Sequence, residues 1–447
     1  MRRFDPGPRL QILLLPFFKI LVFQRIAPVL LWREEVMASA ATMRARVGLT
    51  ARLHLRGIVV LAIAARVFMA AFYFRSHAVT PLAHWGYENV SIALALSAGQ
   101  GFSSPFGFPS GPTAFMPPGY PLLIAGFMRV LGSGVTATLG LITFQILLSV
   151  CTVVLVQKTA SRYFSLRTGN FAGLICALAE PFLVAPLYIW DTCLSALILT
   201  AAVAAAPDLR HRKDFVPAGI TCALAALINP ALLFALFGIF GWAAWRARVI
   251  PWLGLCAFMI AFSPWPLRNY AVMHAFVPLR SNPGYELWLG NQDGSNAESV
   301  LLRDPWQNPK EQRLFLSEGE IGYMREKASI ARSWIRAHPS EFAQFTVRRF
   351  FRFWIGSSKS PAPMTVPLVA AALIGLVLLW RSRPMFSLFA LPLLIFPLPY
   401  YITHADIRFQ FVLDPLLAIL AGYACESFFA WCARRAAPSP TFAAVEN

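Results

Sequence analysis

The sequence predicts an all-α protein that crosses a lipid membrane many times. Of its 447 residues, 57% are hydrophobic and 13% are charged, whereas soluble domains carry about 25% charged residues. The apolar residues occur in long runs, and the mean hydropathy is +0.58. The net charge of +18 comes from Lys and Arg gathered in short loops such as 210–213 and 246–248. Such loops are typical of the cytoplasmic side of membrane proteins, so we do not expect nucleic acid as a partner.

The N-terminal residues 1–56 are expected to form a basic tail. Residues 10–32 are apolar, but two prolines and two basic residues interrupt them, which argues against a regular spanning helix. This segment fits an interfacial helix, or an extension ahead of a start at Met37 or Met43. We do not expect a signal peptide, because no small-residue cleavage site follows a clean apolar run.

Long hydrophobic segments then alternate with polar loops. They cover residues 57–74, 120–131, 137–156, 169–206, 215–228, 231–245, 252–266, 366–380, 386–402 and 411–431. The segment 169–206 is too long for one straight helix, and Pro181 and Pro186 break it. We therefore expect about eleven crossings. They form a transmembrane core at 57–267 and C-terminal transmembrane helices at 365–432, followed by a cytoplasmic tail at 433–447.

Two polar regions interrupt the hydrophobic pattern. The first loop, residues 76–119, is rich in Gly, Pro and aromatic residues, and the second region, 268–364, holds most of the charge. Within the second region we predict helices at 318–337 and 340–354. The basic loops place this region outside the cytoplasm. If the first loop is also outside, the basic loop 158–167 falls on the wrong side, and we expect a re-entrant pair within 169–206 to explain the mismatch.

Few carboxylates lie in the transmembrane core, and a carboxylate at membrane depth is expensive. Between residues 57 and 266 the acidic residues are Glu88, Glu180, Asp191, Asp208 and Asp214. The last two flank a basic loop and are expected to be solvated. Glu88 begins a short amphipathic stretch, as a helix-dipole partner or as a catalytic group. Asp191 is equally a cap or a site residue, and Glu180, before a proline, is expected to be a cap or hinge.

The histidines and cysteines form no metal-binding pattern. The seven cysteines lie in or beside hydrophobic segments, with neither a CxxC motif nor zinc spacing. Four histidines, His84, His274, His338 and His404, are scattered, and each is expected to be an interfacial polar residue. No phosphate-binding or dinucleotide-binding glycine motif is present either. We therefore expect neither a metal nor a cofactor.

A single carboxylate is enough for one class of reaction. A sugar phosphate leaves as a phosphate, which needs no proton, so its transferase needs one base for the acceptor and cations for the phosphate. A glycosidase, in contrast, needs a pair of acids. Each candidate cation, taken singly, could also be a residue at the membrane interface that extends its side chain to keep the charged group in water. The candidate cations are Arg268, Arg280, Arg348, Arg349, Lys359 and Arg408.

Several short motifs, taken in order, resemble one family over about residues 57–431. They are the helix with Arg66, Trp85-Gly86-Tyr87-Glu88, Gly99-Gln100-Gly101-Phe102-Ser103-Ser104-Pro105-Phe106, Gly111-Pro112-Thr113-Ala114, Pro117-Pro118-Gly119-Tyr120-Pro121, Tyr188-Ile189-Trp190-Asp191-Thr192, Leu227-Ile228-Asn229-Pro230, Pro264-Trp265-Pro266-Leu267-Arg268-Asn269-Tyr270, Pro278-Leu279-Arg280-Ser281-Asn282, Glu286-Leu287-Trp288-Leu289-Gly290-Asn291, and Tyr400-Tyr401-Ile402-Thr403 with Arg408. The set resembles the GT-C superfamily of membrane glycosyltransferases. More narrowly, it is similar to glycosyltransferase family 39, the protein O-mannosyltransferases and the lipid A aminoarabinose transferase.

The resemblance implies an inverting hexosyltransferase. It would move a sugar from a polyprenyl-phosphate donor to an extracytoplasmic acceptor, which is a protein, a lipid or a glycan, with Glu88 as the base. The donor phosphate would contact Arg268, Arg280 and Arg408. Further substrate-binding candidates are Trp85, Tyr87, Tyr120, Trp190 and Asp191.

Two other functions are open at this stage. A flippase or exporter of lipid-linked oligosaccharides would perform no covalent chemistry, but it would need polar residues along many helices. This chain concentrates its polar residues in two regions, which favours the enzyme. A non-catalytic scaffold of a cell-envelope complex is the third alternative.

Overall fold

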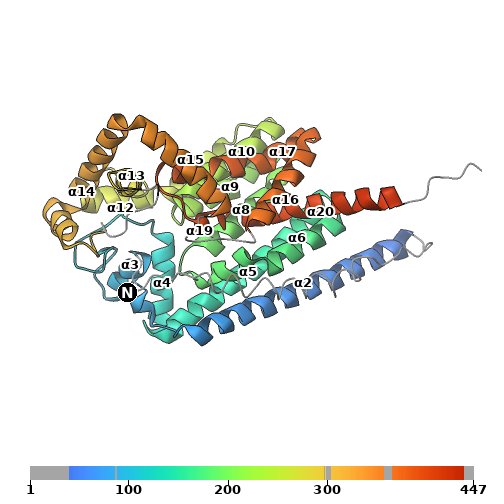
Figure 1. Cartoon of the computed structure of the whole chain (residues 1–447), viewed down its shortest axis with the longest axis horizontal. Helices are drawn as coiled ribbons and strands as arrows, with labels where there is room; N and C mark the ends of the chain where they lie inside the picture. Colours follow the sequence, from blue (N-terminus) through green and yellow to red (C-terminus); the bar gives the residue numbers. More distant parts are fainter. Residues whose placement is uncertain (1–39, 86–87, 296, 298–303, 357–364, 437–447) are drawn as a thin grey trace, which may run out of the picture.

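The computed structural model describes residues 40–85, 88–295, 297, 304–356 and 365–436 (Figure 1). Within these ranges the chain is helical, and its β-structure is one isolated bridge between Ser103 and Pro112. The predicted all-α polytopic class is confirmed. The predicted helices at 318–337 and 340–354 correspond to α14 and α15.

The helices follow one another with short connections. In chain order, the α-helices are α2 (Ala40–Ser76), α3 (Glu88–Ser97), α4 (Gly119–Leu131), α5 (Val135–Tyr163), α6 (Leu166–Leu178), α7 (Glu180–Val184), α8 (Thr192–Ala205), α9 (Phe215–Ala226), α10 (Pro230–Ala247), α11 (Trp252–Phe262), α12 (Pro264–Met273), α13 (Pro283–Gly290), α14 (Pro309–Ala337), α15 (Pro339–Ile355), α16 (Thr365–Leu378), α17 (Arg383–Ile395), α18 (Leu398–Ile402), α19 (Ile407–Gln410) and α20 (Asp414–Ala436). The 3₁₀ turns are η2 (Leu82–His84), η3 (Ala185–Leu187), η4 (Ala206–Asp208), η5 (Arg212–Asp214) and η7 (Leu379–Arg381).

Fewer helices are long enough to cross a membrane than the sequence suggests. Among the described residues, five segments are long and apolar enough, and the pair α6–α7, bent by 54°, makes a sixth. The five are His54–Ser76, Val135–Tyr163, Pro230–Ala247, Arg383–Ile402 and Asp414–Ala433. Several other apolar helices are shorter than the roughly 20 residues that span a bilayer. The expected number of about eleven crossings is therefore not confirmed.

α4 explains the mismatch in the predicted topology. Its 13 residues cover only about 20 Å. In the first turn of α5, Thr138 Oγ1 donates a hydrogen bond to the Thr80 carbonyl at 3.0 Å. Ala83 N donates to the Ser133 carbonyl at 3.4 Å, just ahead of α5. Since Thr80 and Ala83 follow α2, α5 begins at the end of the bundle where α2 stops.

The basic loop 158–167 therefore returns to the end where α2 starts, as the charge pattern requires. The expectation that the segment 169–206 causes the mismatch is wrong; the cause is the segment 120–131, which sequence alone counts as a crossing. We call the end where α2 stops the loop end, because the first loop follows directly. The opposite end is called the basic end.

Contacts between helix termini define the basic end. Arg162, in the last turn of α5, donates to Asp208 after α8, with Nη1 to Oδ2 at 2.8 Å. Ser165, before α6, donates to Glu426 of α20 at 2.7 Å. Trp242 of α10 donates to Ser387 of α17 at 2.9 Å. Basic residues gather in the loops and the adjoining helix ends here: Lys158, Arg162, Arg167, Arg210, Arg212, Lys213, Arg246, Arg248, Arg381 and Arg383.

A buried arginine closes the break between α6 and α7. Arg66 of α2 donates to the carbonyls of Cys176 and Ala177, both at 3.0 Å, and to Ser149 Oγ at 2.8 Å. The last carbonyls of a helix have no intrahelical partner and carry the negative end of the dipole. Arg66 therefore satisfies the end of α6, while Glu180 begins α7 and agrees with its expected place at a hinge.

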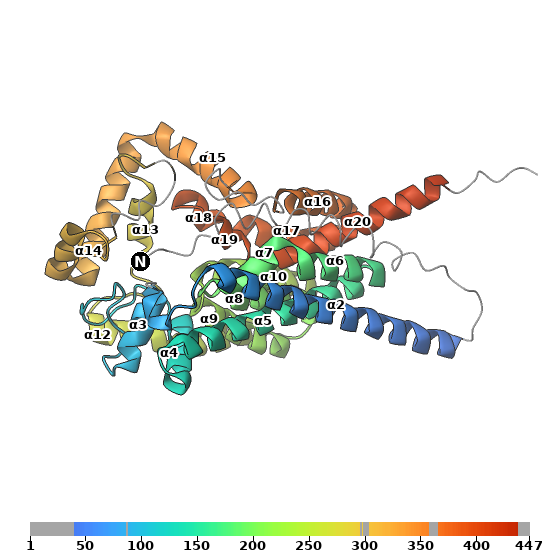
Figure 2. The same cartoon turned by 60° about the horizontal axis from the view of Figure 1, so that its bottom comes forward.

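The two polar regions pack together at the loop end, with α3, α12, α13 and α14 on one side of the molecule (Figures 1 and 2). Aromatic residues of both regions share one buried cluster, so they form a single cap on the bundle. Its buried aromatic members are Phe102, Phe106, Phe115, Trp265, Tyr285, Trp288, Phe315 and Tyr323.

Candidate functional site

Arg268 and Glu320 hold the first loop against the second region; we call these two residues the loop clamp. Arg268 Nη1 donates to the Thr113 carbonyl at 2.6 Å and Nη2 donates to the Phe102 carbonyl at 2.8 Å. The same guanidinium lies 5.5 Å from the Phe102 ring centre. The Arg268 side chain, expected to bind phosphate, is thus engaged by the loop itself.

Glu320 completes the loop clamp from α14. Its carboxylate is buried and accepts hydrogen bonds from Thr113 Oγ1, at 2.5 Å, and from Ala114 N, at 2.9 Å. Burial raises the pKa of Glu320, and these hydrogen bonds together with Arg268 oppose the rise. Glu320 could not be predicted as a partner of the first loop, because only folding brings it to Thr113.

Asp191 lies in a buried polar network between α8 and α10. Its Oδ2 accepts from Ser195 Oγ at 2.6 Å and from Asn229 Nδ2 at 2.9 Å. Asn229 also caps α10, because its Oδ1 accepts from Ala231 N at 3.1 Å. Asp191 precedes α8 but makes no side-chain capping bond to it. The side chain therefore does not cap α8 through a hydrogen bond, and a role for Asp191 in the site stays a prediction.

The irregular turn that carries Trp190 and Asp191 is held from α4 and α5. Gln145 Nε2 donates to the Tyr188 carbonyl at 2.7 Å and to the Pro186 carbonyl at 3.1 Å. Tyr120 donates to Gln145 Oε1 at 3.3 Å and is itself buried. The Tyr120 hydroxyl therefore supports this turn through Gln145.

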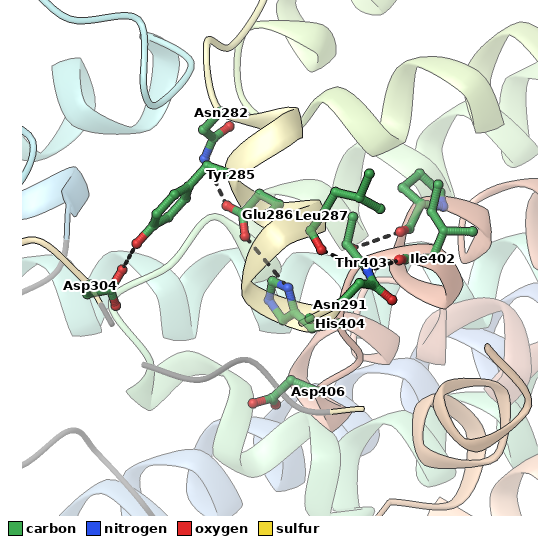
Figure 3. A network of polar contacts seen from close by, with 12 residues as sticks. Asn282, Tyr285, Glu286, Leu287, Asn291, Asp304, Ile402, Thr403, His404 and Asp406 are labelled. Carbon is green, nitrogen blue, oxygen red and sulfur yellow. Dashed lines mark hydrogen bonds and ion pairs between the residues drawn. The ribbon is translucent and has the colours of Figure 1, made fainter. Parts of the chain in front are cut away.

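Four charged or titratable side chains gather beside that turn: Arg280, Glu286, His404 and Arg408. We call them the open charge cluster. Glu286 Oε1 accepts from Asn282 at 2.8 Å, and its Oε2 lies 3.6 Å from His404 Nδ1 (Figure 3). Glu286 Oε1 also accepts from Arg280 at 3.3 Å. The Arg408 guanidinium carbon lies 5.2 Å from the Trp190 ring centre. The four side chains are 16–24% exposed.

His404 was expected to be an interfacial polar residue, and the structure adds a partner for it. It lies in the turn between α18 and α19, facing a glutamate on α13 and four residues before Arg408. Neither pattern nor spacing joins α13 to this turn, because more than a hundred residues separate them.

Glu88 begins α3 and is half-buried. Its neighbours Trp85 and Val90 pack in one apolar cluster with Ile189 and Trp190, so the start of α3 lies near the Asp191 turn. Among the residues that the structure describes, none makes a hydrogen bond or ion pair with the Glu88 carboxylate.

The structure places Arg408 over the Trp190 ring, next to Asp191 in the chain, and links Arg280 to His404 through Glu286. Arg268 is held in the loop clamp instead. Tyr87 and Lys359 fall outside the described residues. The other candidate cations are Arg348, which is exposed on α15, and Arg349, which is buried. Within the described part of the chain, no group of three His, Cys, Asp or Glu side chains is arranged to hold a metal.

One family model matches the chain. It is described as dolichyl-phosphate-mannose-protein mannosyltransferase and covers residues 116–267. The matched residues run from the end of the first loop to α12 and include Tyr120, Asp191 and Asn229. A search of curated proteins found no match.

Solved membrane enzymes have a distantly similar structure. The oligosaccharyltransferase of Archaeoglobus fulgidus in the apo form shares 14% identity over 85% of this chain and 51% of its own, with a TM-score of 0.49. The same archaeal enzyme, AglB, with an inhibitory peptide and a dolichol-phosphate shares 12% over 86% and 52%, with a TM-score of 0.49. ArnT from Cupriavidus metallidurans bound to undecaprenyl phosphate shares 16% over 83% and 78%, with a TM-score of 0.39. This chain spans about half the length of the archaeal oligosaccharyltransferase.

Proposed function

We propose that the chain is a membrane glycosyltransferase of the GT-C superfamily, because the family model described as dolichyl-phosphate-mannose-protein mannosyltransferase matches residues 116–267. It would move a sugar from a polyprenyl-phosphate donor to an extracytoplasmic acceptor. The observation that carries this proposal is the open charge cluster. Arg280 and Arg408 are expected from sequence to hold phosphate. Arg280 pairs with Glu286, which lies 3.6 Å from His404, and Arg408 lies over the Trp190 ring at the same end of the bundle. The hexosyl nature of the sugar and the inverting course of the transfer are parts of the same proposal.

The distribution of charge supports an extracytoplasmic site. The basic loops gather at the end of the bundle opposite the open charge cluster. Short loops rich in Lys and Arg remain in the cytoplasm. The loop end, with Glu88 and Arg408, then faces outward.

Arg408 and Arg280 would hold the donor phosphate. Phosphate is bound strongly by guanidinium groups, which offer charge-assisted hydrogen bonds in a fixed geometry. Arg408 is positioned by the Trp190 and Phe409 rings and lies 3.7 Å from Asp406. Arg280 is positioned by the Phe115 carbonyl at 3.0 Å. Arg268, by contrast, would act on the shape of the first loop.

Glu88 would act as the base. The acceptor oxygen attacks the anomeric carbon, the bond from that carbon to the phosphate oxygen breaks, and the acceptor proton passes to the Glu88 carboxylate. Both electrons of the broken bond leave with the polyprenyl phosphate, which gains one negative charge. The arginines stabilise that charge as it develops. Trp85, Tyr87, Trp190 and Asp191 would contact the substrates.

A donor screen tests the proposal. Purified protein in lipid nanodiscs is incubated with a panel of polyprenyl-phosphate hexoses and envelope extracts, and polyprenyl phosphate and glycosylated product are followed by mass spectrometry. We expect one donor to be consumed with equal amounts of both products. If no donor is consumed but labelled donor crosses vesicles containing the protein, a flippase replaces the transferase.

A further inference from the structure

His404 is a member of the open charge cluster that has no task in the transfer described above. Its ring lies 5.6 Å from the Phe409 ring centre, and Arg408 lies over the same ring at 5.3 Å. Glu286 Oε2 lies 3.6 Å from Nδ1, on the side of the ring that protein atoms cover. His404 and Arg408 therefore flank one aromatic ring, within the group of side chains that would meet the donor phosphate.

The backbone beside His404 is fixed from α13 and α15. Arg349 is fully buried and donates to the Gly290 carbonyl at 2.5 Å, the Ile402 carbonyl at 3.2 Å and Asn291 Oδ1 at 3.0 Å. Asn291 Nδ2 donates to the same Ile402 carbonyl at 2.9 Å. A Cβ on Gly290 would lie 1.9 Å from the Thr403 carbonyl oxygen. This close packing holds the turn, and with it His404, at a set distance from Glu286.

Burial and the nearby charges together set the pKa of His404 before a donor binds. Burial lowers the pKa of His404 most strongly, and Arg408 and Arg349 lower it further. Glu286 and Asp406 oppose them and raise it. The net effect is a pKa below the usual value of about 6.5, so the ring is neutral at neutral pH.

We propose that His404 is a further contact for the donor phosphate and takes up a proton when the donor binds. This inference rests on the proposed function. The Glu286 carboxylate favours a proton on Nδ1, which leaves a lone pair on Nε2 in the neutral ring. A phosphate has no proton to offer that lone pair. Only the imidazolium, with protons on both nitrogens, can donate from Nε2 to a phosphate oxygen.

The bound phosphate supplies the reason for proton uptake. Its negative charge favours the charged form of a nearby histidine and raises its pKa. The proton comes from solvent on binding and returns to solvent when the product leaves. During the transfer, the leaving phosphate gains a second negative charge, and the imidazolium adds a third cation to Arg280 and Arg408.

The sign of the pH dependence follows from the two pKa values. The donor binds the protonated ring better, so affinity is highest below the pKa of the free protein. Affinity falls as the pH rises through the higher pKa of the complex. The donor is a phosphodiester that does not titrate in this range, so its own ionisation does not contribute. A difference of about one unit between the His404 pKa in the complex and in the free protein corresponds to about a tenfold loss of affinity.

The experiment measures donor affinity against pH. Binding of a polyprenyl-phosphate hexose to the full-length protein in nanodiscs is followed between about pH 5 and 8.5, a range that spans the ordinary histidine pKa. We expect the wild type to lose affinity about tenfold across this range. The variant His404→Gln should bind weakly at every pH, with a flat profile. The control His77→Gln, an exposed residue, should keep the wild-type profile.

A second variant guards against misfolding of the first. Glu286→Gln keeps the shape of the side chain but removes the charge that favours imidazolium, so the affinity profile should move to lower pH. An unchanged pH dependence in His404→Gln, or unweakened binding at low pH, would overturn the inference. If the wild type binds no polyprenyl-phosphate sugar at any pH, the proposed function fails instead.

Discussion

The loop clamp and the open charge cluster lie at the same end of the bundle and touch the same first loop, but they leave their charges in different states. In the loop clamp, Glu320 accepts hydrogen bonds from Thr113 and Ala114. Arg268 donates to the carbonyls of Thr113 and Phe102. In the open charge cluster, the side chains contact one another and remain 16–24% exposed. A charge saturated by the protein fixes a shape, whereas one that stays within reach of solvent can serve a ligand.

The largest expected effect concerns Glu88, which the structure places outside both groups. Replacing Glu88 by Gln removes the proton acceptor but keeps the size of the side chain. General-base catalysis contributes about 10²- to 10⁴-fold, and we expect the transfer rate to fall by that factor. Melting temperature and donor affinity should stay at wild-type values. The matched control is Glu341→Gln on the exposed face of α15; full activity in the Glu88 variant would rule out the assigned base.

A smaller effect is expected for Arg408. Arg408→Gln removes a charge that we assign to the donor phosphate, and a hydrogen bond to a charged group contributes about 1.5–3 kcal/mol. The donor KM should rise about 10- to 100-fold, with the acceptor KM unchanged. Steady-state kinetics with each substrate varied separately make the measurement. Arg332→Gln, on the exposed side of α14, is the control, and equal effects on both substrates would contradict the assignment.

Substitutions in the loop clamp should lower the stability of the protein. Glu320→Ala leaves the Thr113 hydroxyl and the Ala114 N–H buried without their partner, at a cost of about 1–3 kcal/mol. We expect a lower melting temperature in detergent. The double variant with Arg268→Gln should lose less than the sum of the single losses, because both act on one loop. An Arg268→Gln protein with wild-type stability and a selectively raised donor KM would move Arg268 into the site.

The smallest effect is expected at Gly290, which packs against the turn that carries His404. Gly290→Ala places a Cβ against the Thr403 carbonyl and shifts the turn that carries His404. A small displacement of a binding group should raise the donor KM about three- to tenfold. Gly126→Ala is the control, because a Cβ there meets nothing within 4 Å. An unchanged donor KM would show that this turn does not contact the donor.

Much of the fold was predictable because lipid imposes strong rules on sequence. Long apolar runs predict the helical membrane class, and the clustering of Lys and Arg predicts which loops share an end. The helix break at Pro181 and the helices of the second region were also found. The helix count was less predictable, since a 13-residue apolar helix such as α4 looks in sequence like a short crossing.

Sequence by itself determined which residue types the site could use: few acids in the membrane core, and arginines in the polar regions. Only the tertiary structure decided which of them lie together. Arg268 and Arg280 lie on the same stretch of chain, and both donate to carbonyls of the first loop. Arg280 also pairs with Glu286 and, through it, lies near His404. The reason is physical: hydrogen-bond saturation and burial depend on contacts between segments far apart in sequence, such as Thr113 with Glu320 or Glu286 with His404.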